Sequence, residues 1–182
     1  MGIERLSAVA DAGPLIHLAE IDCLALLSIF DELHIPDAVW QEATSPDRVS
    51  SADLSRSLHV VRHSVSATDV GQFVTNRKLQ RLHIGERESL YLSTQLEVPL
   101  LLTDDLAVRD SARALGLTPV GSLGVVTKAL RLGEISQEQA ERHISDLYDV
   151  STLFVTKTIV EMAIEHLRTA EVAATRTPDP AT

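Results

Sequence analysis

Acidic side chains follow two short apolar segments of this sequence, a position from which carboxylates can do chemistry. Asp11 comes directly after "SAVA", and Asp104 and Asp105 come after "PLLLT", which ends at Thr103. Adjacent carboxylates repel each other unless a cation or a proton lies between them. Their oxygen atoms suit Mg²⁺ or Mn²⁺ better than zinc, which prefers nitrogen and sulfur ligands. This pattern predicts metal-assisted attack on a phosphodiester, and hydrolysis of nucleic acid follows as a hypothesis.

Three glutamates could add to this acidic group. Glu42 lies in the helical pattern after "HIP", and Glu86 and Glu88 open the helical pattern "ERESLYLSTQL". A second interpretation needs no chemistry, because aspartate is a common helix N-cap and glutamate in a first turn complements the helix dipole. Glu42 could likewise be an ordinary surface residue. Spacing alone leaves both interpretations open.

The elements that must position these residues alternate between strands and helices. Buried strands are predicted at "SAVA", "LHI", "LHVV", "PLLLT" and "LTPV". Pro14 suits a first helical turn, and an apolar stripe follows it as far as Phe30. The alternation predicts an α/β fold with a mainly parallel sheet covered on both faces. Ligands of such folds bind at the carboxyl ends of the strands, near a topological switch point.

Helix starts are indicated by capping residues. Asp37 is predicted to cap "AVWQEA", and Thr103 or Asp104 to cap "LAVRDSARAL". Ser136 and Gln139 form a capping box for "QEQAERHISDLYDV". The turn "GSLGVV" could present amides to a phosphate, but a tight turn with close packing is the favoured interpretation.

Length and composition bound the class of protein. A chain of 182 residues with 45% hydrophobic content fits one globular domain. We expect a nuclease-like domain over 1–150, a C-terminal helix over 151–170 that packs on the body or on a partner, and a disordered tail over 171–182. The single cysteine, Cys23, excludes a disulfide within the chain and fits a reducing cytoplasm. No signal-peptide pattern or membrane-length apolar run is present, so we expect a soluble cytoplasmic protein.

The net charge of the chain limits how it could bind nucleic acid. A net charge of −10 argues against broad, nonspecific adhesion to phosphates. Arg77, Lys78, Arg81 and Arg87 could form a local basic patch beside the acidic residues, or simply a solvated helix face. The histidines lack ligand spacing, and we interpret them as surface or core residues: His17, His34, His59, His63, His83, His143 and His166.

The order of the motifs resembles the PIN-like nucleases. The resemblance rests on "VADAGPLIHLAEID", "HIPDAVWQEA", "HIGERESLYLS", "LLLTDDLAVRDSARALGL" and "VGSLGVVTKALRLGEIS". It is strongest to a prokaryotic subfamily with a GE motif, a DD pair and a G-T/S-L-G turn. It implies a three-layer α/β/α sandwich around a central parallel sheet.

The resemblance also implies site residues and a cofactor. An acidic quartet that binds Mg²⁺ or Mn²⁺ and cleaves RNA corresponds here to Asp11, Glu42, Glu86 and Asp105. Glu88 is an alternative to Glu86, Asp104 could assist in metal binding, and Thr103 could orient a water molecule. The chain departs from the familiar pattern in having glutamate as the third acid, and Gly13 where serine or threonine is common.

Proteins of this size and pattern resemble VapC-type toxins, which are silenced by a small antitoxin. The resemblance implies a homodimer, for which the stretch Leu24–Phe30 and the C-terminal helix would offer apolar surface. Two other classes remain open. One is a PIN-like binding module with a weakened site. The other is an aspartate-nucleophile phosphatase or receiver domain, although Gly13 stands where a phosphatase would carry its second aspartate.

Overall fold

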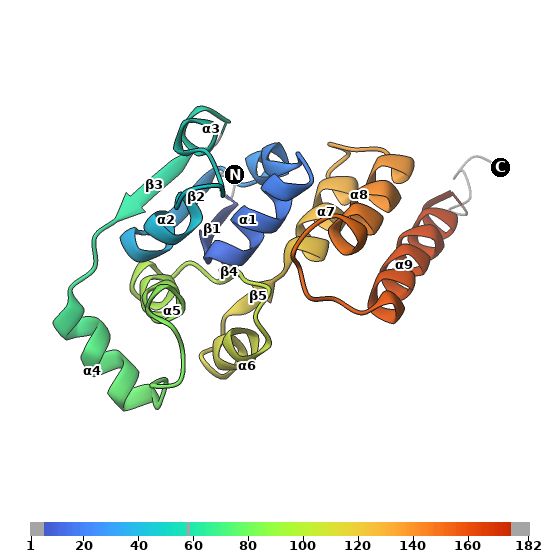
Figure 1. Ribbon diagram of the computed structural model, residues 1–182. Helices are drawn as coiled ribbons and strands as arrows, with labels where there is room; N and C mark the ends of the chain where they lie inside the picture. Colours follow the sequence, from blue (N-terminus) through green and yellow to red (C-terminus); the bar gives the residue numbers. More distant parts are fainter. Residues whose placement is uncertain (1–5, 58, 176–182) are drawn as a thin grey trace, which may run out of the picture.

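The computed structural model describes the backbone of residues 6–57 and 59–175 and contains a central sheet of five strands, all parallel (Figure 1). The strands are β1 (Ser7–Ala10), β2 (Glu32–Pro36), β3 (Val60–His63), β4 (Leu100–Leu102) and β5 (Thr118–Val120). This confirms the predicted α/β class, with β3 displaced toward the C-terminus relative to "LHVV".

The strand order β3-β2-β1-β4-β5 places a switch point beside the first strand. The chain moves from β1 outward to β3 and then returns to lay β4 against the opposite side of β1. Val9 pairs with His34 of β2 and with Leu101 of β4. The carboxyl ends of β1 and β4 therefore lie side by side where the winding direction reverses, which is where ligands bind in open parallel sheets.

Helices cover both faces of the sheet and complete the expected α/β/α sandwich. Ala8 and Ala10 face one core and Val9 the other, because side chains alternate along a strand. The first core packs against α1 (Ala12–Glu20), the 3₁₀ helix η1 (Leu24–Ile29), α2 (Asp37–Ala43), α3 (Ser51–Ser57), α7 (Ser122–Arg131), α8 (Gln137–Asp149) and α9 (Lys157–Thr175). The second core packs against α4 (Ala67–Arg77), α5 (Ile84–Leu96) and α6 (Leu106–Ala114).

Local helix signals were partly right. The capping box at Ser136 and Gln139 is confirmed, with both reciprocal hydrogen bonds present. The apolar stripe after Pro14 is not one helix, because α1 ends at Glu20 and the stripe continues in η1. Asp37 is the first helical residue of α2 rather than its cap.

The cap of α6 is Asp105, not Thr103 or Asp104.

The C-terminal part differs from the expected boundaries. Residues 150–156 run without helical structure, and α9 starts at Lys157 instead of 151 and continues past 170 to Thr175. Of the expected tail over 171–182, residues 176–182 lie outside the described residues. No helix in the described part of the chain has the length and hydropathy of a membrane span.

Candidate active site

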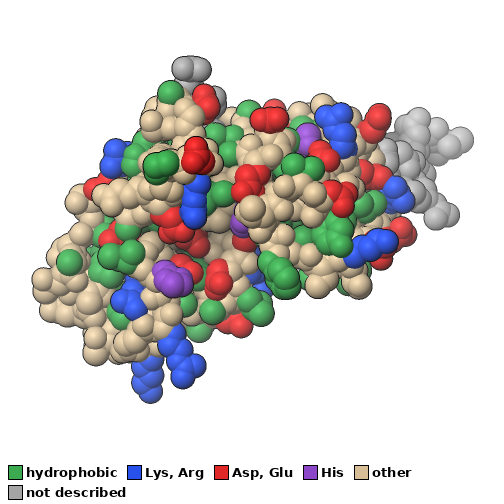
Figure 2. All heavy atoms as spheres, in the orientation of Figure 1, with side chains coloured by type: hydrophobic (Ala, Val, Ile, Leu, Met, Phe, Trp, Pro, Cys, Tyr) green, Lys and Arg blue, Asp and Glu red, His purple; other side chains and the backbone are tan. Residues whose placement is uncertain are grey.

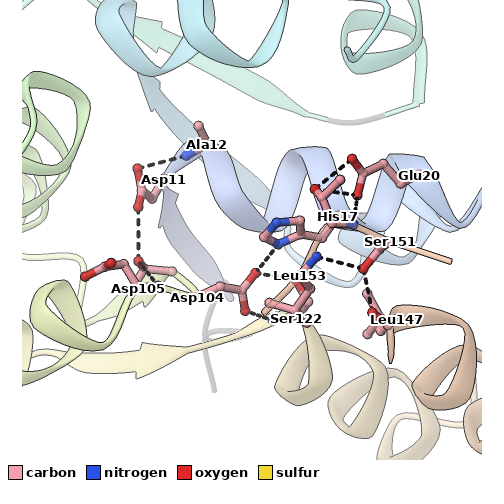
Figure 3. Close-up of polar contacts among 12 residues, drawn as sticks. Asp11, Ala12, His17, Glu20, Asp104, Asp105, Ser122, Leu147, Ser151 and Leu153 are labelled. Carbon is pink, nitrogen blue, oxygen red and sulfur yellow. Dashed lines mark hydrogen bonds and ion pairs between the residues drawn. The ribbon is translucent and has the colours of Figure 1, made fainter. Parts of the chain in front are cut away.

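Asp11 lies at the carboxyl end of β1 and begins α1 as its N-cap. Its Oδ1 accepts a hydrogen bond from the Ala12 N–H at 2.9 Å, and its Oδ2 accepts one from the Thr103 hydroxyl at 3.0 Å (Figure 3). The Asp11 N–H donates to the Leu102 carbonyl at 2.9 Å, which ties the end of β1 to β4. The two strand ends therefore hold Asp11 in place, and its side chain is 6% exposed.

The two adjacent aspartates after β4 point to different helices. Asp105 caps α6 by accepting a hydrogen bond from the Val108 N–H at 2.9 Å. Asp104 turns toward α1 and α7 (Figure 3). Its Oδ1 accepts from the Ser122 N–H at 2.8 Å, and its Oδ2 accepts from the Ser122 hydroxyl at 2.6 Å and lies 2.8 Å from His17 Nδ1. Helix N-termini thus take up much of the charge of the pair.

His17 is a site residue that sequence reasoning missed. It was interpreted as an ordinary surface or core histidine, yet its imidazole lies against Asp104 and lines the same cleft as the acidic residues. The local signal was its place on the helix that Asp11 caps. Two turns of α1 carry His17 to the side of Asp104, a contact that only the tertiary structure creates.

The glycine turn before α7 packs on a carboxylate of the chain itself. A Cβ at Gly121 would lie 2.7 Å from Asp104 Oδ1 and 3.0 Å from Arg109 Nη1. Glycine is required there because the backbone approaches these atoms closely. The segment is a tight turn with close packing, and the Ser122 N–H donates to Asp104.

The three glutamates separate into different environments. Glu86 lines the acidic cleft, and its Oε2 accepts a hydrogen bond from the His83 N–H at 2.7 Å. Glu88 instead accepts one from the Ala38 N–H at 3.2 Å, at the start of α2, and burial raises the pKa of its carboxyl. Glu42 also lines the cleft; its side chain is 49% exposed and its Oε1 lies 3.6 Å from Arg48 Nη1.

These side chains surround one cleft of about 550 Å³ at the switch point. Figure 2 shows acidic side chains gathered around the middle of this face. The carboxylates that line the cleft are Asp11, Glu42, Glu86, Asp104 and Asp105. The structure thus brings all four residues of the expected quartet to one cleft, together with Asp104. Glu88, on α5, instead accepts a hydrogen bond at the start of α2.

The cleft disfavours its own negative charge. Burial raises the pKa of Asp11 to about 6, with smaller contributions from the carboxylates of Glu86 and Glu42 and against the hydrogen bonds from Ala12 and Thr103, which lower it. A divalent cation would relieve this repulsion, and an all-oxygen donor set has the chemistry that Mg²⁺ or Mn²⁺ prefers. Among the described residues, however, no three acidic, histidine or cysteine side chains already converge on a metal position. The donor set fits in chemistry, and the half-exposed Glu42 has the freedom to turn inward.

A non-helical segment between α8 and α9, here called the strap (residues 150–156), forms one wall of the cleft. Thr152 fastens it to α1: the Thr152 N–H donates to Glu20 Oε2 at 2.7 Å, and its hydroxyl donates to Glu20 Oε1 at 2.9 Å. Thr152, Leu153 and Phe154 all line the cleft. These residues belong to the segment expected as a C-terminal helix over 151–170, and their place in the cleft was not predicted.

Comparison with known proteins identifies the family to which this architecture belongs. A family model described as a PIN domain matches residues 7–169, from β1 into α9. A search of curated proteins finds no match to the chain.

Proposed function

Because the chain belongs to the PIN-domain family, we propose that it is a metal-dependent ribonuclease that hydrolyses RNA phosphodiester bonds in the acidic cleft. PIN domains are generally nucleases that act on nucleic acid with divalent metal ions. One observation carries the proposal for this chain. The buried Asp11 shares a cleft at the switch point with four further carboxylates, and two of them raise its pKa.

We assign the metal ligands to Asp11, Glu42, Glu86 and Asp105. Asp105 uses Oδ1 for the helix cap, so Oδ2 is the atom assigned to the cation. A bound Mg²⁺ or Mn²⁺ would supply stabilisation of the negative charge that develops on the phosphate. Thr103 acts on Asp11 rather than on a water molecule, because its hydroxyl donates to Asp11 Oδ2 and holds the carboxylate in one orientation.

Asp104 is assigned a positioning role in place of direct metal binding. Asp104 has three polar contacts, since its Oδ1 accepts from the Ser122 N–H and its Oδ2 meets both the Ser122 hydroxyl and His17, whereas each oxygen of Asp11 accepts a single hydrogen bond. These contacts also bear on Gly13. A Cβ there would lie 3.6 Å from Asp104 Oδ2, so a hydroxyl at this position would serve a carboxylate that Ser122 already serves. The missing hydroxyl is therefore compatible with an active site.

We further propose that the enzyme is the cytoplasmic toxin of a toxin–antitoxin pair and forms a homodimer. An antitoxin segment rich in arginine would complement the acidic cleft, since guanidinium groups pair with carboxylates in two-point geometry. Within the stretch Leu24–Phe30, Leu27 and Phe30 are buried in the core and offer nothing to a dimer contact. We assign the contact with a second copy to α9, where Ile159 and Met162 are exposed.

A second candidate function rests on a specific observation. Asp11 and Asp105 cap the helices that follow them, and Asp104 accepts from the first N–H of α7. A PIN domain with a weakened site would still need a helix-capping side chain at each of these positions for folding. The chain could then bind nucleic acid or protein without cleaving it.

Cleavage of labelled single-stranded and structured RNA separates the two functions. The purified chain is assayed with Mg²⁺, with Mn²⁺ and with EDTA, beside Asp11→Asn and Asp105→Asn. Asp110→Asn is the matched control, because this aspartate is exposed on α6 and pairs with Arg113. We expect metal-dependent cutting that the first two variants lose and the control keeps. A folded wild-type chain that cuts no RNA in either metal would refute the nuclease and support the binding module.

The toxin role has its own test. Expression of the wild-type chain alone should arrest growth of a bacterial host, and Asp11→Asn should not. Co-expression with the product of a short open reading frame next to the gene should restore growth. Growth unaffected by an active nuclease would refute the toxin role while leaving the enzyme.

A further inference from the structure

The strap presents an aromatic side chain to solvent at the rim of the acidic cleft. Phe154 is 98% exposed and lines the cleft with Asp11, Glu86 and Asp105. Its orientation follows from the alternation of burial along the strap. Leu153 and Val155 pack against the core, so the residue between them must point outward.

The other phenylalanines show how unusual this placement is within the chain. Phe30 is buried, and Phe73 packs edge-to-face on Tyr91 with ring centroids 5.6 Å apart. A fully exposed phenyl ring adds nothing to the folded core, because the ring is as wet as in the unfolded chain. Phe154 therefore has no structural role that accounts for its type.

Hydrogen bonds anchor the strap just before Phe154. Thr152 is hydrogen-bonded to Glu20 of α1 through its N–H and its hydroxyl. On the same segment the Ser151 hydroxyl donates to the Leu147 carbonyl at 2.6 Å and accepts from the Leu153 N–H at 3.2 Å (Figure 3). A ring on an anchored backbone loses little freedom when it meets a ligand, which favours binding.

Charge around the cleft indicates which ligand would need such a ring. The chain carries a net charge of −10, and two arginines near the acidic residues already have partners within the chain. Arg48 faces Glu42, and Arg109 donates to the Thr103 carbonyl at 3.2 Å. These two side chains therefore neutralise phosphates weakly, and contacts to the bases would add affinity for a nucleic acid strand.

We propose that Phe154 is a stacking platform for an unpaired base of the RNA substrate, next to the scissile phosphate in the acidic cleft. The assignment rests on the proposed nuclease function and makes single-stranded RNA its substrate class, since bases within a duplex already stack on one another. Ile84, 66% exposed and on the same cleft, offers a second apolar contact to the strand.

The test measures binding and cleavage separately. Fluorescence anisotropy follows a labelled single-stranded RNA and a duplex of the same sequence in EDTA, where metal-dependent cutting is absent. Phe154→Ala should weaken binding of the single strand about 5- to 150-fold, the range for loss of one stacked base. The slope of log affinity against log salt should stay the same, because the ring neutralises no phosphate. Cleavage in Mg²⁺ should fall with binding at subsaturating RNA.

Two further variants make the result specific. Phe154→Trp should bind at least as tightly as wild type, with tryptophan fluorescence quenched by RNA beyond the change at the native Trp40. Leu132→Ala, which removes an exposed apolar side chain at the end of α7 and away from the cleft, should bind as wild type does. Equal affinity for wild type and Phe154→Ala would overturn the proposal. So would a change in sedimentation of Phe154→Ala with RNA binding intact, which would assign the ring to a protein interface.

Failure of the proposed nuclease function and failure of the stacking platform would give different combinations of binding and cleavage results. If the wild-type chain cuts no RNA but Phe154→Ala still loses affinity for the single strand, the stacking platform stands on a binding module. If the wild-type chain cuts RNA and Phe154→Ala cuts and binds equally well, the platform alone is refuted.

Discussion

Replacement of Asp11 by asparagine should make the metal-free protein more stable at neutral pH. Burial raises the pKa of this carboxyl from 3.8 to about 6. Between these two pH values the folded state binds more protons than the unfolded state, so the free energy of unfolding falls as pH rises. A difference of about two pKa units at about 1.4 kcal/mol each amounts to about 3 kcal/mol, fully lost above pH 6.

The asparagine variant escapes this loss because it has no charge to bury. Asparagine caps helices as well as aspartate does, so its oxygen can still accept from the Ala12 N–H. Its amide can donate to the Thr103 oxygen. We therefore expect Asp11→Asn to exceed wild type by up to about 3 kcal/mol above pH 7 and to match it near pH 4.

Urea unfolding in EDTA at pH 4, 6 and 8 measures this difference, with Asp110→Asn as a surface control of the same charge change. Addition of Mg²⁺ at pH 8 should then stabilise wild type, by about 2.7 kcal/mol at one hundred times the dissociation constant, and Asp11→Asn much less. A difference between wild type and Asp11→Asn that does not change with pH would refute the electrostatic reasoning. Equal stabilisation of both by Mg²⁺ would refute the assignment of Asp11 as a ligand.

Three further predictions test other parts of the structure. Glu86→Gln should lower Mg²⁺-dependent RNA cleavage about 100-fold or more, whereas Glu88→Gln should leave the rate near wild type; the reverse order would exchange their roles. Gly121→Ala should cost about 1–3 kcal/mol in urea unfolding, because its Cβ would lie 2.7 Å from a carboxylate oxygen, and an unchanged midpoint would contradict that close approach. His34 and His63 share a hydrogen bond of 3.0 Å, and burial lowers the pKa of both. The free energy of unfolding of the wild type should therefore fall as pH drops below about 6.5, because the unfolded state then binds more protons. A His34→Gln variant whose urea midpoints match those of wild type at both pH 5 and pH 7.5 would refute this role.

Much of the fold follows from local sequence signals. Apolar runs gave the strands, and their alternation with helical patterns gave the parallel sheet, because crossover helices must join parallel neighbours. The break between α1 and η1 was not visible, since the apolar stripe continues past Asp22, which takes a left-handed conformation. The strand order was not accessible either, because it depends on which faces the helices cover.

The candidate site was predictable where it depends on strand ends. Asp11 and Asp105 follow β1 and β4, and a parallel sheet brings those ends together by geometry. The orientation of Asp104, the approach of His17 and the exposure of Phe154 depend on contacts between distant segments. No local signal places the strap residues outside a helix and beside the cleft, because that position depends on contacts such as the one between Thr152 and Glu20.

Because the aspartates after β1 and β4 satisfy helix N-termini, their presence in a sequence is evidence of the shared fold but not of catalytic activity. In a relative whose catalysis has been lost, selection for folding alone would keep helix-capping side chains, aspartate or asparagine, at the positions of Asp11, Asp104 and Asp105, because each satisfies a helix N-terminus. Glu42 caps no helix, and its half-exposed carboxylate pairs with Arg48 at the edge of the cleft. In sequences of this type, Glu42 is the position at which a drift away from catalysis would first leave a trace.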